Sequence, residues 1–335
     1  MLSVDDTELL FKDLNNWHFI RTQTSLNCSF FSSEQLQTWS QTNSQPEVGI
    51  FIFILGLITI SMSIPTTVAM FFKDNFQYPV FKIMSLISIA DSISLLITGV
   101  ASGFLLINGI GPCDAPLTNL IFGGLYYGCF IFTSTSTILL LVTRIVEMSN
   151  SIYFAFILRT RFIYSYMIIA FIYAVCITLF TKPMTFSPVV ISWNFNPFMG
   201  YLPENRQLMR NIVYIVHDAI FVSFSLLAYL TFAIFYIKKV SSLSQPTQSS
   251  SSMSVRLTLQ ILTISSIDTL VCVLCVSNNL MDLNKATHVI GHVTWILYAA
   301  SPSIVIWTFN KSFRKTFMAK LFKPRIGPLI TVYSK

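Results

Sequence analysis

The stretch GIFIFILGLITISMSIPTTVAMFF, residues 49–72, sets the class of this protein, because it is apolar and carries no charged side chain. A bilayer core of about 30 Å is crossed by about 20 residues of helix, so this stretch is long enough to span a membrane. Residues 1–48 before it are polar, so we expect no cleavable signal peptide. The stretch is therefore predicted to target the chain and to remain as its first transmembrane helix.

Six more apolar stretches of similar length follow the first one. They cover residues 82–107, 117–144, 162–181, 211–237, 256–281 and 287–309. Each is long enough for a helix that crosses a bilayer, and the longest of them leave room for tilt. The chain is therefore predicted to be an all-α membrane protein, a bundle of seven transmembrane helices.

Composition supports lipid as the main solvent of this chain. Hydrophobic residues make up 53% and charged residues 10%, and the mean hydropathy is +0.67. A soluble globular domain carries roughly 25% charged residues. The net charge of +7 lies in short loops and in the tail rather than in a separate basic domain, which argues against nucleic acid as a partner.

The positive charges also indicate how the helices are oriented. If the amino terminus lies outside, most of the 21 Lys and Arg residues fall in inside loops and in the carboxyl-terminal tail, as the positive-inside rule requires. Acidic residues favour the opposite side. We therefore expect an extracellular tail at 1–48, the seven-helix bundle at 49–310 and a cytoplasmic segment at 311–335.

A short amphipathic segment follows the seventh span. Phe313, Phe317 and Leu321 recur there every four residues, and Lys and Arg occupy the other faces. This spacing predicts a short interfacial helix that lies on the membrane against anionic lipid.

Two cysteines, Cys28 and Cys113, fall in segments predicted to be extracellular, and the others fall within spans. An oxidising compartment favours disulfides, and each of the two has only the other as a partner. We expect a Cys28–Cys113 disulfide, with two free thiols as the alternative. Asn27 is a glycosylation acceptor in Asn27-Cys28-Ser29, so glycosylation and the disulfide would compete.

Charged groups within a bilayer are costly and usually serve a function. Asp91 lies near the middle of the second span, where it can bind a cation or join helices through water, or stay protonated against neighbouring Ser. Asp218 lies where it can meet a ligand or pair with an adjacent helix, and Asp268 lies midway along the sixth span. Arg144 ends the third span, either as an interfacial anchor or in an ion pair that breaks on activation.

Aromatic and polar side chains gather in the outer halves of the third, fifth, sixth and seventh spans. The candidates for a ligand pocket are Tyr126, Tyr127, Tyr214, Asn278, Asn279, Trp295 and Tyr298, with Asp218. Aromatic rings with polar tips suit a mostly apolar pocket with few polar anchors. They equally suit the aromatic belt at a membrane surface.

The common enzyme motifs for phosphate binding, nucleophilic serine and zinc are absent, and nothing in the sequence indicates a cofactor. His288 and His292 share one helix face and could bind zinc, so a seven-helix zinc hydrolase is one alternative. A transporter or channel is another, although we find no inverted repeats.

Short motifs occur in a fixed order along the chain. They are Asn27-Cys28, Trp39, Pro46-Glu-Val-Gly49, Tyr78-Pro79, Lys82-Ile-Met84, Asp91, Cys113-Asp-Ala-Pro116, Arg144, Thr181-Lys-Pro183, Trp193-Asn-Phe-Asn-Pro197-Phe198 and Phe309-Asn310-Lys311. In these motifs and their spacing the sequence resembles the nematode serpentine chemoreceptors, most closely serpentine receptor class T, over nearly its whole length.

This resemblance implies a G-protein-coupled receptor for a small environmental molecule. It also implies a heterotrimeric G protein as the partner and the ciliary plasma membrane of a sensory neuron as the location. Ligand binding would shift the helix bundle to a state that binds the G protein, with no chemistry done on the ligand.

Agreement with the wider rhodopsin-like receptors is partial. Thr143 stands where an acid usually precedes the third-helix Arg, so Glu147 or Asp74 would have to replace that acid. Ser301-Pro302 resembles the usual Asn-Pro pair of the seventh helix, and we expect Pro302 to take part in activation. The sixth span has neither Trp nor Pro, so we expect the activation machinery to differ.

The orientation predicts the accessibility of both ends of the chain. On intact cells, a tag at the amino terminus should bind antibody without permeabilisation, whereas a tag at the carboxyl terminus should require it. Cys28 and Cys113 should react with a membrane-impermeant thiol reagent only after reduction. An accessible carboxyl terminus would overturn the orientation.

Overall fold

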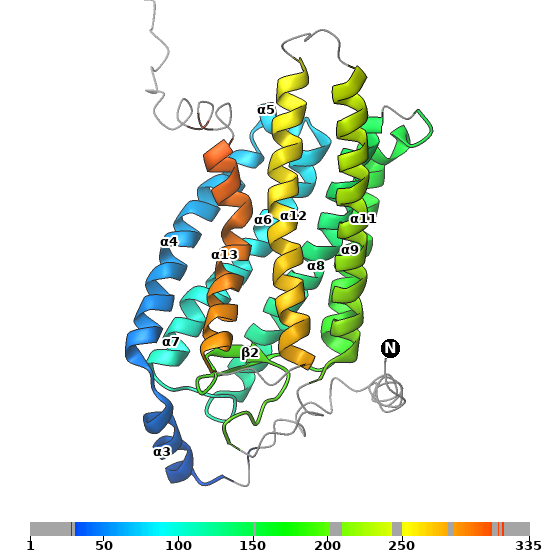
Figure 1. Ribbon diagram of the computed structural model, residues 1–335. Coiled ribbons are helices and arrows are strands. Elements are labelled where there is room, and N and C mark those ends of the chain that lie inside the picture. Colours follow the sequence, from blue (N-terminus) through cyan, green and yellow to red (C-terminus); the bar gives the residue numbers. More distant parts are fainter. Residues whose placement is uncertain are drawn as a thin grey trace, which may run out of the picture.

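The computed structural model describes residues 28, 31–149, 152–201, 210–242, 250–280, 285–309, 314 and 317, and this part of the chain is almost entirely helical (Figure 1). Lipid offers no hydrogen bonds to the backbone, so an apolar stretch satisfies its own N–H and C=O groups by forming a helix. The spanning helices are α4 (Pro46–Met70), α6 (Pro79–Leu95) continued by α7 (Ser102–Ile107), α8 (Pro116–Ser149), α9 (Thr160–Phe180), α11 (Ile212–Ser242), α12 (Ser250–Leu280) and α13 (Lys285–Phe309).

These helices follow the seven predicted stretches closely. Six are apolar over the length that a membrane span needs, and α12 contributes the shorter apolar part Leu259–Leu274 among its described residues. Large apolar side chains point away from the bundle, such as Phe51 and Ile58, each 54% exposed, which is the surface that lipid covers. The predicted all-α membrane fold is confirmed.

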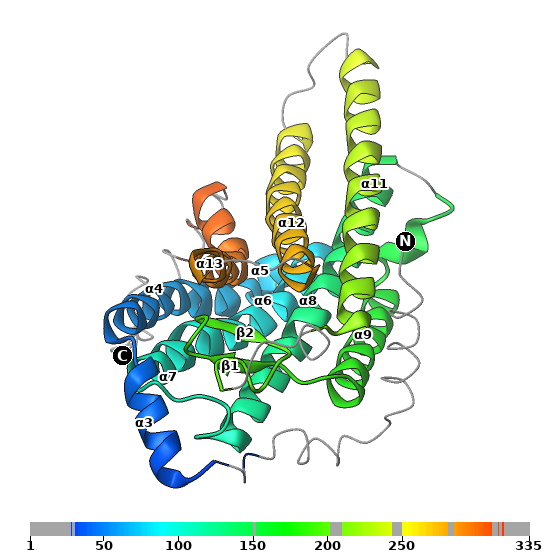
Figure 2. The same ribbon diagram turned by 60° about the horizontal axis from the view of Figure 1, so that its bottom comes forward.

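Short elements close one end of the bundle, which we call the hairpin end. They are α3 (Ser33–Asn43) and the antiparallel strands β1 (Thr185–Ser187) and β2 (Ser192–Asn194), with Phe186 opposite Trp193. Figure 2 shows the hairpin lying across the ends of the spanning helices. At the opposite end, α5 (Lys73–Phe76) and a 3₁₀ turn (Ala155–Leu158) connect spans, and α11 and α12 extend past their neighbours (Figure 1). The hairpin was not predicted from the sequence.

The second span is interrupted by a π-helical turn, Leu96–Ala101, between α6 and α7. Ser102 Oγ donates to the carbonyl of Ile97, five residues earlier, at 2.9 Å. The same hydroxyl accepts a hydrogen bond from Trp193 Nε1 at 2.8 Å. The π-helical turn therefore positions Ser102 to bind the tryptophan of the hairpin. Such turns are frequent at functional sites.

Helix α8 runs through the middle of the bundle and packs against α6, α9, α11 and α12. Buried apolar residues form one cluster at the hairpin end and another at the opposite end. Between them lies a layer of buried polar side chains, which includes Asp91, Thr133, Thr137, Asp268 and Ser301. A polar layer inside a bundle surrounded by lipid needs internal partners, and it is described below.

Glycines let α4 cross the second span at very short range. A Cβ atom added at Gly56 would lie 2.6 Å from the Cα of Gly99, and one added at Gly103 would lie 2.7 Å from the backbone nitrogen of Phe53. Small residues at helix crossings are typical of membrane bundles, because close packing replaces the missing hydrophobic effect.

Gly56→Ala should therefore force α4 away from the second span and lower the free energy of unfolding by about 1–3 kcal/mol. Gly124→Ala is the matched control, because a Cβ there meets only Thr178 Cγ2, at 3.6 Å. It should be neutral or stabilise by up to about 1 kcal/mol through helix propensity. Thermal unfolding of the purified variants in detergent measures both, and equal midpoints would contradict the close crossing.

Candidate ligand site

Aromatic rings of α8 and α13 meet directly beneath the hairpin. The ring centroid of Trp295 lies 5.3 Å from that of Tyr126, 4.7 Å from that of Phe130 and 5.2 Å from that of Tyr298. Trp193 of the hairpin adds a ring 5.8 Å from Tyr126. The structure thus brings together three predicted pocket residues, Tyr126, Trp295 and Tyr298, and supplies Phe130 and Trp193, which the sequence reading did not assign to the site.

A second group of rings adjoins the first. Tyr127, Phe195 and Tyr214 form a triangle with centroids 5.5, 5.8 and 5.2 Å apart. Phe130 contacts Tyr214 at 5.7 Å and so joins this aromatic triangle to the rings around Trp295. All of these side chains except Trp295 are buried. Predicted residue Tyr214 therefore lies in the same aromatic region as the others.

The segment after α9 forms the roof of this region. Phe186 is 0% exposed and Trp193 only 8%, although both belong to a connection between spans. The backbone nitrogen of Phe186 donates to Asn119 Oδ1 at 2.9 Å, which fixes β1 to the start of α8. Apolar composition identifies spans but does not indicate that a loop is buried, so the sequence did not predict this roof. The Trp193–Phe198 motif contributed only to the resemblance to the family.

His217 and Asp218 are both buried on α11. His217 Nε2 lies 2.7 Å from Ser134 Oγ, and its Nδ1 lies 3.2 Å from the Tyr173 hydroxyl, so the imidazole joins α11 to α8 and α9. Asp218 is 0% exposed, and neither of its oxygens has a hydrogen-bond partner within the described part of the chain.

The polar layer joins three helices through threonines of α8. Thr133 Oγ1 donates to Asp91 Oδ1 at 3.3 Å, and Thr137 Oγ1, one turn later, donates to Asp268 Oδ2 at 3.2 Å. The two carboxylates act electrostatically on each other and on the Tyr298 hydroxyl. Asp91 and Asp268, which the sequence reading treated separately, therefore belong to a single network that reaches the aromatic region.

At the opposite end, Arg144 is buried and pairs with Glu147 three residues later on α8. Of the two acids suggested as replacements at this position, Glu147 is the one that pairs with Arg144; the side chain of Asp74 lies outside the described residues.

On α13, Pro302 is buried inside the helix, directly after Ser301. His292 Nε2 lies 2.9 Å from the carbonyl oxygen of Thr98.

Three predictions fall on parts of the chain that the structure does not describe. They concern the Asn278 and Asn279 side chains, the glycosylation acceptor Asn27 and most of the interfacial helix. Of that segment, Arg314 and Phe317 are described and helical. Arg314 Nη1 donates to the carbonyl of Trp307 at 2.6 Å, and the Phe317 ring packs edge-on against Trp307 at 5.2 Å.

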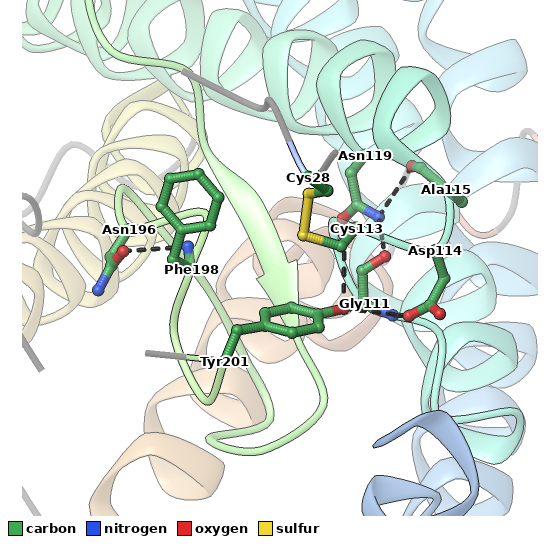
Figure 3. Close-up of a disulfide and its surroundings, with 9 residues drawn as sticks. All are labelled: Cys28, Gly111, Cys113, Asp114, Ala115, Asn119, Asn196, Phe198 and Tyr201. Carbon is green, nitrogen blue, oxygen red and sulfur yellow. Dashed lines mark hydrogen bonds between the residues drawn. A yellow bond between two sulfur atoms is a disulfide. The ribbon is translucent and has the colours of Figure 1, made fainter. Parts of the chain in front are cut away.

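A disulfide joins Cys28 to Cys113, as expected, and ties the amino-terminal segment to the start of α8 (Figure 3). Beside it, the Tyr201 hydroxyl donates to Asp114 Oδ2 at 3.1 Å and accepts from the Cys113 backbone nitrogen at 3.4 Å. Burial raises the pKa of the Tyr201 phenol above its ordinary value, and the Asp114 carboxylate raises it further, so the donor stays protonated.

The ring of Tyr201 stacks on that of Trp39 with centroids 3.9 Å apart, and Trp39 Nε1 donates to the carbonyl of Gly200 at 2.9 Å. Helix α3, the disulfide and the hairpin connection are thereby held together as one cap over the aromatic region. The covalent bond holds the amino-terminal segment, whereas hydrogen bonds and stacking hold the hairpin connection.

Tyr201→Phe should weaken this cap, because the ring still stacks on Trp39 while two hydrogen bonds are lost. The expected loss is about 1–2 kcal/mol of unfolding free energy. Tyr153→Phe is the matched control, since Tyr153 is 89% exposed at the opposite end. Thermal unfolding compares the two, and an equal response would show that the hydroxyl contributes nothing.

A sequence model of the family described as "Serpentine type 7TM GPCR chemoreceptor Srt" matches residues 14–327. A search of curated proteins gives no match. Among solved structures, squid rhodopsin is similar with a TM-score of 0.63 and 12% sequence identity, covering 83% of this chain and 85% of that one. At this identity the likeness concerns the fold.

Proposed function

Since the chain belongs to the Srt family of serpentine seven-transmembrane chemoreceptors, we propose that it is a G-protein-coupled receptor that detects a small molecule outside the cell. The comparisons support an integral membrane protein of a chemoreceptor family with a rhodopsin-like fold. In our proposal the hairpin end faces outward, the opposite end binds a heterotrimeric G protein, and the protein lies in the ciliary membrane of a sensory neuron.

The ligand site lies between the hairpin and the polar layer. Its walls are the aromatic rings of Tyr126, Phe130, Tyr214, Trp295 and Tyr298, which offer a large apolar surface with few polar anchors, as ligand pockets generally do. The hairpin and the amino-terminal cap cover it. With the hairpin end outside, these elements face the medium that carries the ligand.

The observation that carries the proposal is the continuity between this site and the polar layer. Tyr298 packs against Trp295 in the aromatic region, and its buried hydroxyl, which has no hydrogen-bond partner among the described residues, is close enough to Asp91 and Asp268 for their charges to act on it. A ligand that moves Trp295 or Tyr298 therefore changes the surroundings of two carboxylates that hold α6 and α12 against α8. Such differential contacts are what a population shift of a helix bundle requires.

The opposite end supplies the surface for the G protein. Arg144 is held by Glu147 within α8, and a change in helix packing that opens this end would free the guanidinium for a partner. Helices α11 and α12 extend past the other spans there (Figure 1), and these extensions offer a binding surface for an intracellular protein. The basic loops expected on this side agree with the positive-inside rule.

Asp268→Asn should lower basal nucleotide exchange on a coupled G protein about fivefold, equivalent to about 1 kcal/mol. The amide keeps the size and the acceptor for Thr137 but cannot ionise, so no negative charge can form there beside Asp91, and the resting packing is stabilised. The measurement is GTP exchange with the receptor in lipid nanodiscs, tested against each class of G protein.

Glu47→Gln is the control, because it neutralises an exposed carboxylate outside the network. It should exchange nucleotide as the wild type does. Absence of exchange by the wild type with every G protein would contradict the proposed function. Equal nucleotide exchange by the wild type and Asp268→Asn would show that the Asp91–Asp268 pair takes no part in activation.

A further inference from the structure

The carboxylate of Asp218 is buried near the hairpin end of α11 with its hydrogen-bonding capacity unused. The side chain is 0% exposed, and no described residue donates to either oxygen. Tyr214, one turn earlier, interacts with it but outside hydrogen-bond geometry. Desolvating a lone carboxylate costs several kcal/mol, so such groups normally accept several hydrogen bonds or face a cation.

No cation of the described chain fills this role. The ion pair found among the described residues joins Arg144 to Glu147, and Arg144 lies more than four helical turns along α8 from Tyr127, roughly 25 Å away. His217, the neighbour of Asp218, already uses both ring nitrogens on Ser134 and Tyr173.

A second unused polar group lies beside the first. The Tyr127 hydroxyl is buried and has no hydrogen-bond partner in the described part of the chain, although Thr181 and Asn211 lie nearby. The Tyr127 and Tyr173 hydroxyls lie close enough to Asp218 for its charge to act on them. One donor group placed between Asp218 and Tyr127 would satisfy both residues.

The aromatic triangle of Tyr127, Phe195 and Tyr214 adjoins these two unpaired groups. Tyr127 is itself a member of the triangle, and Tyr214 lies one helical turn before Asp218. Aromatic faces attract cations through the ring quadrupole, and this attraction is strongest in a site that excludes water. A carboxylate beside these tilted and edge-on rings therefore favours a positively charged head group with an apolar body.

We propose that Asp218 binds the protonated amino group of a small primary amine, whose apolar body packs against the aromatic triangle. The ammonium donates one hydrogen bond to Asp218 and one to the oxygen of Tyr127. This inference rests on the proposed receptor function and names the chemical class of its ligand. In this arrangement Asp218 recognises the positive charge of the ligand. The rings around Trp295 then transmit the effect of ligand binding to the polar layer.

The test uses three probes of similar shape that differ in the head group: phenethylamine, phenethyl alcohol and propylbenzene. Binding to the purified full-length receptor in lipid nanodiscs is followed by the shift of its thermal midpoint with probe concentration at neutral pH. The wild type should bind the amine at least about tenfold more tightly than the alcohol, and the hydrocarbon more weakly still.

Asp218→Asn should weaken amine binding by about 30-fold or more, because it removes the charge from a desolvated pair, and change alcohol binding by less than about twofold. Tyr127→Phe should weaken amine binding by a smaller factor, and it serves as the second variant if Asp218→Asn does not fold. Glu47→Gln, which removes an exposed carboxylate, should bind as the wild type does.

Equal affinity for amine and alcohol, no binding of the amine, or an equal loss for both probes in Asp218→Asn would each overturn the inference. The binding assay contains no G protein, so its result is separate from the test of the proposed function. Selective amine binding without nucleotide exchange would refute the receptor function alone. Nucleotide exchange without amine selectivity would refute the amine site alone.

Discussion

Lipid cannot hydrogen-bond, and this constraint governs how most polar side chains within the described spans are arranged. Hydroxyl groups within spans mostly return to a carbonyl one turn earlier in their own helix, as Thr59, Thr98 and Thr294 do. Carboxylates have no such local solution, since they can only accept. Asp91 and Asp268 are therefore satisfied across helices, by threonines of α8, and the network that results joins α6, α8 and α12 at mid-bundle.

The same constraint explains why α8 is central to the structure. It supplies rings to the aromatic region through Phe130, threonines to the polar layer and Arg144 at the opposite end. Thr143, which stands where an acid would usually precede that Arg, donates to the carbonyl of Leu140 in its own helix. The proposed ligand site, the carboxylate network and the proposed G-protein surface thus lie in order along one helix of 34 residues.

The spans could be predicted from the sequence because each one is an unbroken apolar stretch whose length the bilayer fixes. The disulfide could be predicted because Cys28 and Cys113 are the cysteines outside spans. The roof over the proposed ligand site could not, because β1 and β2 have three residues each and their burial depends on tertiary packing. Nor could the sequence show that Asp91 and Asp268 share a network or that Asp218 lacks a partner, since a residue's depth does not specify which residue it faces on a neighbouring helix.

The account's central claim is that hydrogen bonds through α8 join the spans around the polar layer. A double-mutant cycle with Thr137→Val and Asp268→Ala tests it most directly, through the unfolding free energies of both single variants and the double variant in mixed micelles. The account predicts a coupling energy of at least about 0.6 kcal/mol, the average found for interhelical hydrogen bonds in a bilayer protein, where the largest reach about 1.7 kcal/mol. Additive effects within about 0.3 kcal/mol would show that the two helices are not joined there.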